Sequence, residues 1–295
     1  MIVSGILEVL LWLTLLSLVW LVGWILLAHV RYISYHRRNG LALPRLGPGG
    51  WMIFYVRLLV AIVTLSWWFF RGMAQDGLRS PADGKPGKPV LCVHGFHMND
   101  TCMWGLRRAL ERRGRPTRAL FLGWPYRPAT SYAEALAPVM IEMRAAFPEE
   151  GFDIVAHSMG GLIVRMVLAQ RPELAGVVGR IVTLGTPHHG TAFLRTIRHG
   201  PVYDMMSRES SLLAELPDFR QTVPDSDVVT VAAVPDLVVY PVDTNHLAGA
   251  RAFNLRREGH SSLLTHPSAI ELVAQMICGD DRSGGTSASP VEIEL

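Results

Sequence analysis

The chain has 295 residues, of which 49% are hydrophobic, and its mean hydropathy is +0.25. A positive mean hydropathy is high for a purely soluble protein and indicates membrane segments. The net charge of +3 is too small to indicate a nucleic-acid-binding protein, and no long basic run with interleaved aromatic residues occurs. The three cysteines have no metal-ligand spacing, and their odd number excludes complete pairing within the chain. We therefore expect no metal site and no cofactor.

The N-terminal part predicts a membrane helix. Residues 9–28 are twenty consecutive residues without a charge. At about 1.5 Å per residue, a helix of this length crosses the roughly 30 Å hydrocarbon core of a bilayer. A signal peptide fits less well, because no Lys or Arg precedes the apolar run and no small-x-small cleavage motif follows it. We expect a retained transmembrane helix, through which the chain could form a homo-oligomer.

A second apolar stretch, 51–70, follows a connector, 29–50, that carries four arginines. It contains Arg57, which a spanning helix tolerates if the side chain snorkels towards the connector. The alternative is an interfacial helix lying flat on the membrane. If both segments span, the positive-inside rule places the connector in the cytoplasm and the rest of the chain in the periplasm of a bacterial inner membrane. If only the first spans, the rest is cytoplasmic.

After the membrane region 1–74, the composition divides the chain into a Pro/Gly-rich linker at 75–89, a globular domain at 90–279 and a polar tail at 280–295 that we expect to be disordered. Apolar strands are predicted at 90–93, 119–122, 154–156, 181–184 and 228–234. Helices are predicted at 101–112, 131–147, 159–170 and 269–277. Strands that alternate with amphipathic helices predict an α/β fold with a mostly parallel sheet covered on both faces.

A serine stands where the third strand meets a helix, in the segment Ala156-His157-Ser158-Met159-Gly160. Small residues on both sides allow a tight strand-to-helix turn that exposes the hydroxyl above the sheet. The positive end of the following helix would favour negative charge on a substrate oxygen. Ser158 is therefore the candidate nucleophile.

The segment "VLCVHGFH" (90–97) supplies a second part of such a site, because an apolar strand ends in His94-Gly95-Phe96. We expect the backbone N–H groups of Phe96 and Met159 to form an oxyanion hole. Gly95 lets the loop turn towards the site, and His94 is expected to hydrogen-bond that loop.

A serine nucleophile needs an acid and a base. In α/β folds with the serine at such a strand-to-helix turn, the acid and then the base follow it along the chain. Asp236 lies just past the strand 228–234 and is the preferred acid, with Asp243 as the alternative. His260 follows a glycine in the loop before the last helix and is the preferred base. His246 and His266 remain alternatives.

These motifs resemble the α/β-hydrolase fold lipases and esterases, notably the bacterial triacylglycerol lipase type. The resemblance covers 89–278 and rests on "VHGF", "DIVAHSMGGLIVR", "IVTLGTPHHGT", "VPDLVVYP" and "GHSSLL". It implies an α/β-hydrolase fold and a catalytic triad of Ser158, His260 and Asp236. A segment rich in Leu, Met and Phe, at about 191–222, is expected to form a helical cap over the cleft. The candidate substrate-binding residues are His94, Gly95, His157, His188 and Phe193.

The expected activity is hydrolysis of carboxylic esters of lipids by a membrane-anchored lipase, phospholipase or esterase, with membrane lipids or lipid esters as its partners. A thioesterase or acyltransferase could use the same triad. A non-catalytic membrane scaffold on a hydrolase fold is a further alternative, which the presence of the whole catalytic machinery disfavours.

Overall fold

The computed structural model describes residues 2–71, 77–80, 87–196, 200–279 and 289–295. The chain divides into two compact units, Met1–Leu43 and Pro44–Leu295. The first unit consists mainly of one helix, α1 (Ile2–Arg38). The second unit holds the second apolar helix, α2 (Gly47–Arg71), together with the globular domain. The predicted boundary at residue 74 therefore differs from the division in the structure, because α2 packs against the domain that follows it.

Among the described residues, one helix, Gly47–Trp68 within α2, is long and apolar enough to cross a membrane. The predicted span 9–28 lies within α1, where the side chains at 9–11, 13–15 and 18 fall outside the described residues. Several transmembrane helices were expected, whereas the described part of the chain contains one candidate helix.

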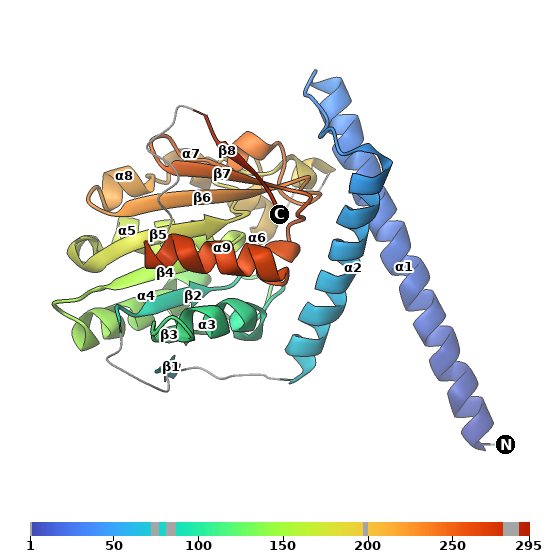
Figure 1. The fold of residues 1–295 in the computed structure, drawn as a ribbon, viewed down its shortest axis with the longest axis horizontal. Coiled ribbons are helices and arrows are strands. Elements are labelled where there is room, and N and C mark those ends of the chain that lie inside the picture. The colour runs from blue at the N-terminus through green and yellow to red at the C-terminus, as the bar shows by residue number, and fades with distance from the viewer. Residues whose placement is uncertain (1, 72–76, 81–86, 197–199, 280–288) are drawn as a thin grey trace. The chain divides into compact units, whose positions relative to one another are not determined.

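Eight strands form one sheet in the described part of the chain, in the order β1-β3-β2-β4-β5-β6-β7-β8 (Figure 1). Their bounds are β1 Gly77–Arg79, β2 Val90–Val93, β3 Thr117–Ala119, β4 Phe152–His157, β5 Val178–Leu184, β6 Asp227–Val234, β7 Arg251–Arg256 and β8 Val291–Glu294. All neighbouring pairs are parallel except β1 with β3. Every residue of β2 and β4 is buried, as expected of central strands covered on both faces.

Helices cover both faces of this sheet (Figure 1). The helices α4 (Ala129–Ala146) and α5 (Met159–Gln170) contribute to one apolar cluster, and α3 (Trp104–Glu111) and α9 (Pro267–Cys278) contribute to the other. Short helices between β5 and β6 are α6 (Pro201–Met206), α7 (Ser211–Glu215) and α8 (Phe219–Thr222). Within the residues that the structure describes, the helical elements also include five 3-10 turns: η1 Asp100–Met103, η2 Pro172–Val177, η3 Ala192–Thr196, η4 Val242–Asn245 and η5 Ser262–Leu264.

Three strands differ from the sequence predictions. β1 lies in the predicted linker, and β7 was not predicted because arginines at both of its ends and Asn254 within it interrupt the apolar pattern. β8 lies in the tail predicted to be disordered. There, Val291 and Ile293 pack against the core while Glu292 and Glu294 are exposed, which is the alternation of an edge strand. The predicted tail residues 280–288 lie outside the described residues.

One face of α2 packs against the domain. Phe54 and Ala61 are fully buried, and the Trp68 ring lies 5.4 Å from the Trp104 ring of α3. The other face exposes Met52, Val56, Leu59, Val60, Val63 and Trp67, which recur at helical spacing. Arg57 lies on the packed side and forms a 2.5 Å ion pair with Glu258. Its side chain is thus directed to the domain rather than to the connector.

Candidate active site

The turn between β4 and α5 has the geometry of a nucleophile elbow. Ser158 follows the last residue of β4 and has φ 54° and ψ −126°, a strained conformation for a residue with a side chain. A Cβ on Gly160 would lie 2.6 Å from the carbonyl oxygen of His94. Glycine is favoured at position 160 because the end of β2 passes over it.

The structure brings Ser158, His260 and Asp236 together at the carboxyl ends of β4, β6 and β7. Ser158 Oγ lies 2.9 Å from His260 Nε2, and His260 Nδ1 lies 2.8 Å from Asp236 Oδ2. The backbone N–H groups of Val238 and Val239 donate to Asp236 Oδ1 at 2.7 and 2.8 Å. All three triad side chains are buried. The carboxylate is thus held in one orientation towards the imidazole.

The alternative acid and bases are engaged elsewhere. Asp243 lies in η4. His246 bonds Thr230 through Nδ1 and Asn254 through Nε2, each at 2.9 Å. His266 Nδ1 lies 3.0 Å from Glu258 Oε1. None of these side chains has a hydrogen bond to Ser158 among the described contacts.

The loop after β2 lies directly against the elbow. A Cβ on Gly95 would lie 2.9 Å from the Ser158 Cβ, so the backbone at Gly95 passes beside Ser158. Met159 is the first residue of α5, where backbone N–H groups have no partner within the helix. The two segments expected to supply the oxyanion hole thus both adjoin Ser158.

His94 fixes this loop and does not line the site. Its Nδ1–H donates to the Gly95 carbonyl at 2.8 Å, and its Nε2 accepts from the Leu122 N–H at 3.0 Å. Burial lowers the pKa of His94 to about 4, so the ring is neutral and both nitrogens are used. His94 thus links the loop after β2 to the loop after β3.

The two other candidate histidines are also buried supports. His157 Nε2–H donates to the His260 backbone oxygen at 3.1 Å, and burial, together with the nearby His260, lowers the pKa of His157. His188 Nε2 lies 3.0 Å from the Thr183 hydroxyl, and burial, followed by the charge of Arg165, lowers its pKa. Both are at most 1% exposed, which leaves no surface for a substrate.

The predicted cap, 191–222, contains η3 and the short helices α6 to α8, with 197–199 outside the described residues. Phe193 is half-buried and packs against the apolar cluster of α4 and α5. Arg165 of α5 donates to the carbonyl oxygens of His188, Leu216 and Pro217, at 2.9, 2.7 and 3.2 Å. Through these bonds Arg165 links the predicted cap to α5, the helix that follows Ser158.

Sequence reasoning missed Glu258, which lies two residues before His260. Its side chain is fully buried, and it accepts hydrogen bonds from Arg57 and from the Ser262 hydroxyl. Burial raises the pKa of Glu258 to about 7, against the lowering effects of Ser262 and Arg57. The signal in the sequence was Arg57 itself, because a guanidinium within an apolar helix requires a carboxylate partner when it is buried.

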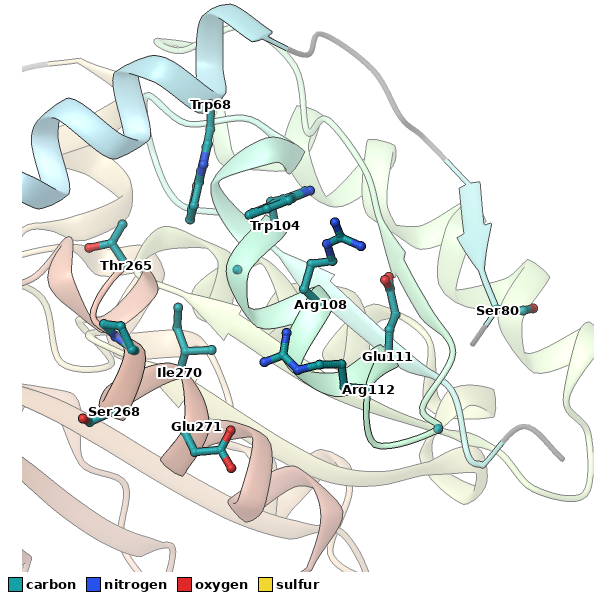
Figure 2. Close-up of a pocket in the computed structure, with 13 residues that line it drawn as sticks. Trp68, Ser80, Trp104, Arg108, Glu111, Arg112, Thr265, Ser268, Ile270 and Glu271 are labelled. Atoms are coloured by element: carbon teal, nitrogen blue, oxygen red, sulfur yellow. The ribbon is translucent and has the colours of Figure 1, made fainter. Parts of the chain in front are cut away.

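A groove of about 1180 Å³ lies between α2, α3 and α9 (Figure 2). Its wall includes Trp68, Trp104 and Arg108, with the Arg108 guanidinium 5.0 Å from the Trp104 ring centre. No triad residue lines it, so this groove is separate from the site. Within the described residues, no group of His, Cys, Asp and Glu side chains could hold a metal ion.

Comparisons with known proteins agree with this architecture. A family model described as a PGAP1-like alpha/beta domain matches residues 130–247, a range that includes Ser158 and Asp236. The structure of Aspergillus fumigatus lipase B superposes with a TM-score of 0.57 at 16% identity, covering 72% of this chain and 58% of that one. The mature form of Bacillus licheniformis lipase BlEst2 gives a TM-score of 0.51 at 19% identity, covering 70% and 97%. The metagenomic carboxyl esterase MGS0156 gives a TM-score of 0.52 at 16% identity, covering 67% of this chain and 77% of that one.

At identities this low, a structural match shows the fold, and the reaction must be argued from the geometry of the site. The match spans little more than half of the Aspergillus fumigatus lipase. Together with the parallel sheet, the helices on both faces and the strained serine after β4, these matches show that the chain has the α/β-hydrolase fold.

Proposed function

We propose that the protein is a serine hydrolase that cleaves carboxylic esters through an acyl-enzyme, with Ser158 as nucleophile, His260 as base and Asp236 as acid. The observation that carries this proposal is the continuous chain of hydrogen bonds from Ser158 Oγ through both nitrogens of His260 to Asp236. A free serine hydroxyl is a poor nucleophile, and an adjacent oriented base is what activates it.

In the first half-reaction, Ser158 Oγ attacks the ester carbonyl carbon and His260 Nε2 takes the hydroxyl proton. Asp236 accepts the hydrogen bond from Nδ1–H and stabilises the imidazolium that forms. The tetrahedral intermediate then collapses, and His260 gives the proton to the departing alcohol. In the second half-reaction, water activated by His260 cleaves the acyl-enzyme and restores Ser158.

Negative charge on the carbonyl oxygen is the main cost of both tetrahedral intermediates. The backbone N–H groups of Phe96 and Met159 are the proposed donors, and each such donor contributes roughly 3 kcal/mol in enzymes of this kind. The N-terminus of α5 adds a favourable dipole at the same point. The strain at Ser158 is the cost of placing its hydroxyl beside these donors.

We further propose that the enzyme works on lipid esters at a membrane. The exposed apolar face of α2 supports this proposal, since six large apolar side chains there lie in one stripe. Its opposite face is packed and carries the Arg57–Glu258 pair, which favours an interfacial position for α2 over a spanning one. With α1 as the spanning segment, the positive-inside rule then puts the catalytic domain in the cytoplasm.

The test of the reaction is hydrolysis of p-nitrophenyl butyrate by the detergent-purified protein and by its Ser158→Ala variant. The proposal predicts that the variant loses at least 1,000-fold of kcat, in line with nucleophile removal in other triads. An undiminished rate in Ser158→Ala refutes the assignment. Thioester substrates and alcohol acceptors, measured on the same preparation, separate ester hydrolysis from thioesterase and acyltransferase activity. A reporter fused to the C-terminus tests the topology, and a periplasmic signal would contradict it.

A further inference from the structure

Two loops beside the proposed oxyanion hole carry a cluster of aromatic rings that faces solvent. The loop after β2 contributes Phe96 and His97, and the loop after β3 contributes Phe121, Trp124 and Tyr126; we name these five residues the aromatic shelf. Phe121 is 38% exposed, Trp124 67% and Tyr126 64%. Large aromatic side chains exposed together are uncommon on a protein surface without a binding role.

The rings of the aromatic shelf contact one another. The Phe96 ring lies 5.3 Å from that of Tyr126 and 4.4 Å from that of His97, both edge to face. The Phe121 ring lies 5.9 Å from that of Trp124. The shelf therefore has two groups of touching rings. One consists of Phe96, His97 and Tyr126, and the other of Phe121 and Trp124, in which the Phe121 ring stacks on that of His94 at 6.0 Å.

The loops that hold these rings are fixed from below. His94 joins them by accepting the Leu122 N–H at 3.0 Å. The buried Tyr132 hydroxyl donates to the Trp124 carbonyl and accepts from the Arg127 N–H, each at 3.2 Å. The exposure of Phe121, Trp124 and Tyr126 is thus held by buried side chains and is a property of the fold.

Backbone strain marks the same place. Among the residues that the structure describes, four non-glycine residues have positive φ: His97 (56°), Tyr126 (65°), Ser158 (54°) and Arg257 (62°). Ser158 is the proposed nucleophile, and Arg257 begins the loop that carries His260. The other two belong to the aromatic shelf and face each other, with His97 Nε2 accepting from the Tyr126 hydroxyl at 2.9 Å. Such strained residues concentrate at active sites and ligand clamps, which connects the shelf to the site.

We propose that the aromatic shelf binds an alkyl chain of the ester substrate as the chain leaves the oxyanion hole. The Phe96 backbone would bind the carbonyl oxygen, so a chain attached to that carbonyl group passes the Phe96 ring within a few bonds. This proposal rests on the proposed esterase function and adds the place where an apolar chain of several carbons binds.

The polar groups of the shelf favour an alkyl chain over a sugar. Carbohydrates stack on aromatic rings, but they also need side-chain hydrogen bonds to their hydroxyl groups. The His97 Nε2 and the Tyr126 hydroxyl already bond each other. The exposed surface of the shelf is mainly apolar ring surface, which methylene groups can contact favourably.

The test is a series of p-nitrophenyl esters from acetate to octanoate, each below its micelle concentration, on wild type and on Trp124→Ala and Phe121→Ala. The matched control is Trp104→Ala, since Trp104 is 41% exposed on α3 and lines the separate groove rather than the aromatic shelf. We expect each shelf variant to lower the octanoate-to-acetate ratio of kcat/KM about tenfold, mainly through a higher KM for octanoate. The control keeps the wild-type ratio.

Three results would overturn the proposal. One is an unchanged ratio in both shelf variants. Another is an equal loss on acetate and octanoate, which would indicate a structural role for the rings. The last is weaker binding to phosphatidylcholine vesicles with an unchanged ratio on monomeric esters, which would make the shelf a bilayer contact. A failure of the esterase proposal itself looks different, because acetate hydrolysis would then persist in Ser158→Ala.

Discussion

The pairing of Arg57 with Glu258 predicts a destabilisation that depends on pH when the arginine is removed. Glu258 has no exposed side-chain surface, and Arg57 is 17% exposed. Arg57 also donates to the backbone oxygens of Arg257 at 3.3 Å and Leu295 at 2.9 Å. In Arg57→Ala, the Glu258 carboxylate keeps the hydroxyl of Ser262 and the ring of His266 but loses its cation.

The magnitude follows from the burial of Glu258. Breaking one partner out of a buried ion pair costs about 3–5 kcal/mol, because the remaining charge is left without compensation. Burial already raises the pKa of Glu258 from 4.5 to about 7 in the wild type. The folded state therefore binds a proton more tightly than the unfolded state. This group's contribution to stability is fully present below pH 4.5, and about 3 kcal/mol of it is lost as the pH rises through 7.

Removing Arg57 raises this pKa further, since the arginine lowers it in the wild type. At pH 5 the carboxyl group of the variant can stay protonated, and we expect a loss of about 1 kcal/mol or less. At pH 8 the variant must either ionise a buried carboxyl or keep it protonated above the carboxyl's unfolded-state pKa. We expect its free energy of unfolding to fall by about 3 kcal/mol. For a domain of this size, that corresponds to a fall in Tm of roughly 6–12 °C at pH 8.

The assay is thermal unfolding followed by circular dichroism in detergent at pH 5 and pH 8. The variants are Arg57→Ala, Glu258→Gln and the double variant Arg57→Met with Glu258→Gln. The double variant removes both charges and is expected to recover most of the stability that Arg57→Ala loses at pH 8. The reasoning is refuted if Arg57→Ala costs as much at pH 5 as at pH 8, or if the double variant is as unstable as Arg57→Ala at pH 8.

The remaining predictions concern the triad, the elbow and α2. Asp236→Asn should lower kcat on p-nitrophenyl butyrate by about 10⁴, with the fold unchanged by circular dichroism, because an amide cannot hold the imidazole in the required tautomer; a loss below tenfold would exclude Asp236 as the acid. Gly160→Ala should destabilise the protein by about 1–3 kcal/mol, since its Cβ would lie 2.6 Å from the His94 oxygen. The control, Gly176→Ala, has open space at that point, and equal melting temperatures for the two would contradict the packing argument. Val60→Glu should weaken binding to lipid vesicles about tenfold or more because it places a charge in the exposed stripe of α2, whereas Gln170→Glu should leave binding unchanged.

The fold, and the meeting of Ser158, His260 and Asp236, could be predicted from the sequence because their signals are local. Short apolar strands alternate with helices, and a serine among small residues follows one of them. The sequence favours His260 because glycine precedes it, yet the structure gives another reason for Gly259. A Cβ there would lie 3.0 Å from the ring of Phe54, so the glycine allows α2 to pack against the loop.

What the sequence could not predict depends on contacts between distant segments. Glu258 meets Arg57 across 201 positions, and no local pattern links them. β8 is recognisable only because β7 lies beside it, since four residues of alternating valine, glutamate and isoleucine do not form a strand alone. The sequence does not predict the aromatic shelf because its rings are divided between two loops, and His94 joins these loops only in the folded chain.

Covalent labelling tests the central proposal most directly. The detergent-purified protein is treated with a fluorophosphonate probe, digested and analysed by mass spectrometry, in parallel with the Ser158→Ala variant. We predict one major adduct, on the peptide that contains Ser158, together with loss of ester hydrolysis in proportion to labelling. An unlabelled Ser158 in a protein that still hydrolyses esters, or an equal rate in Ser158→Ala, would contradict the account.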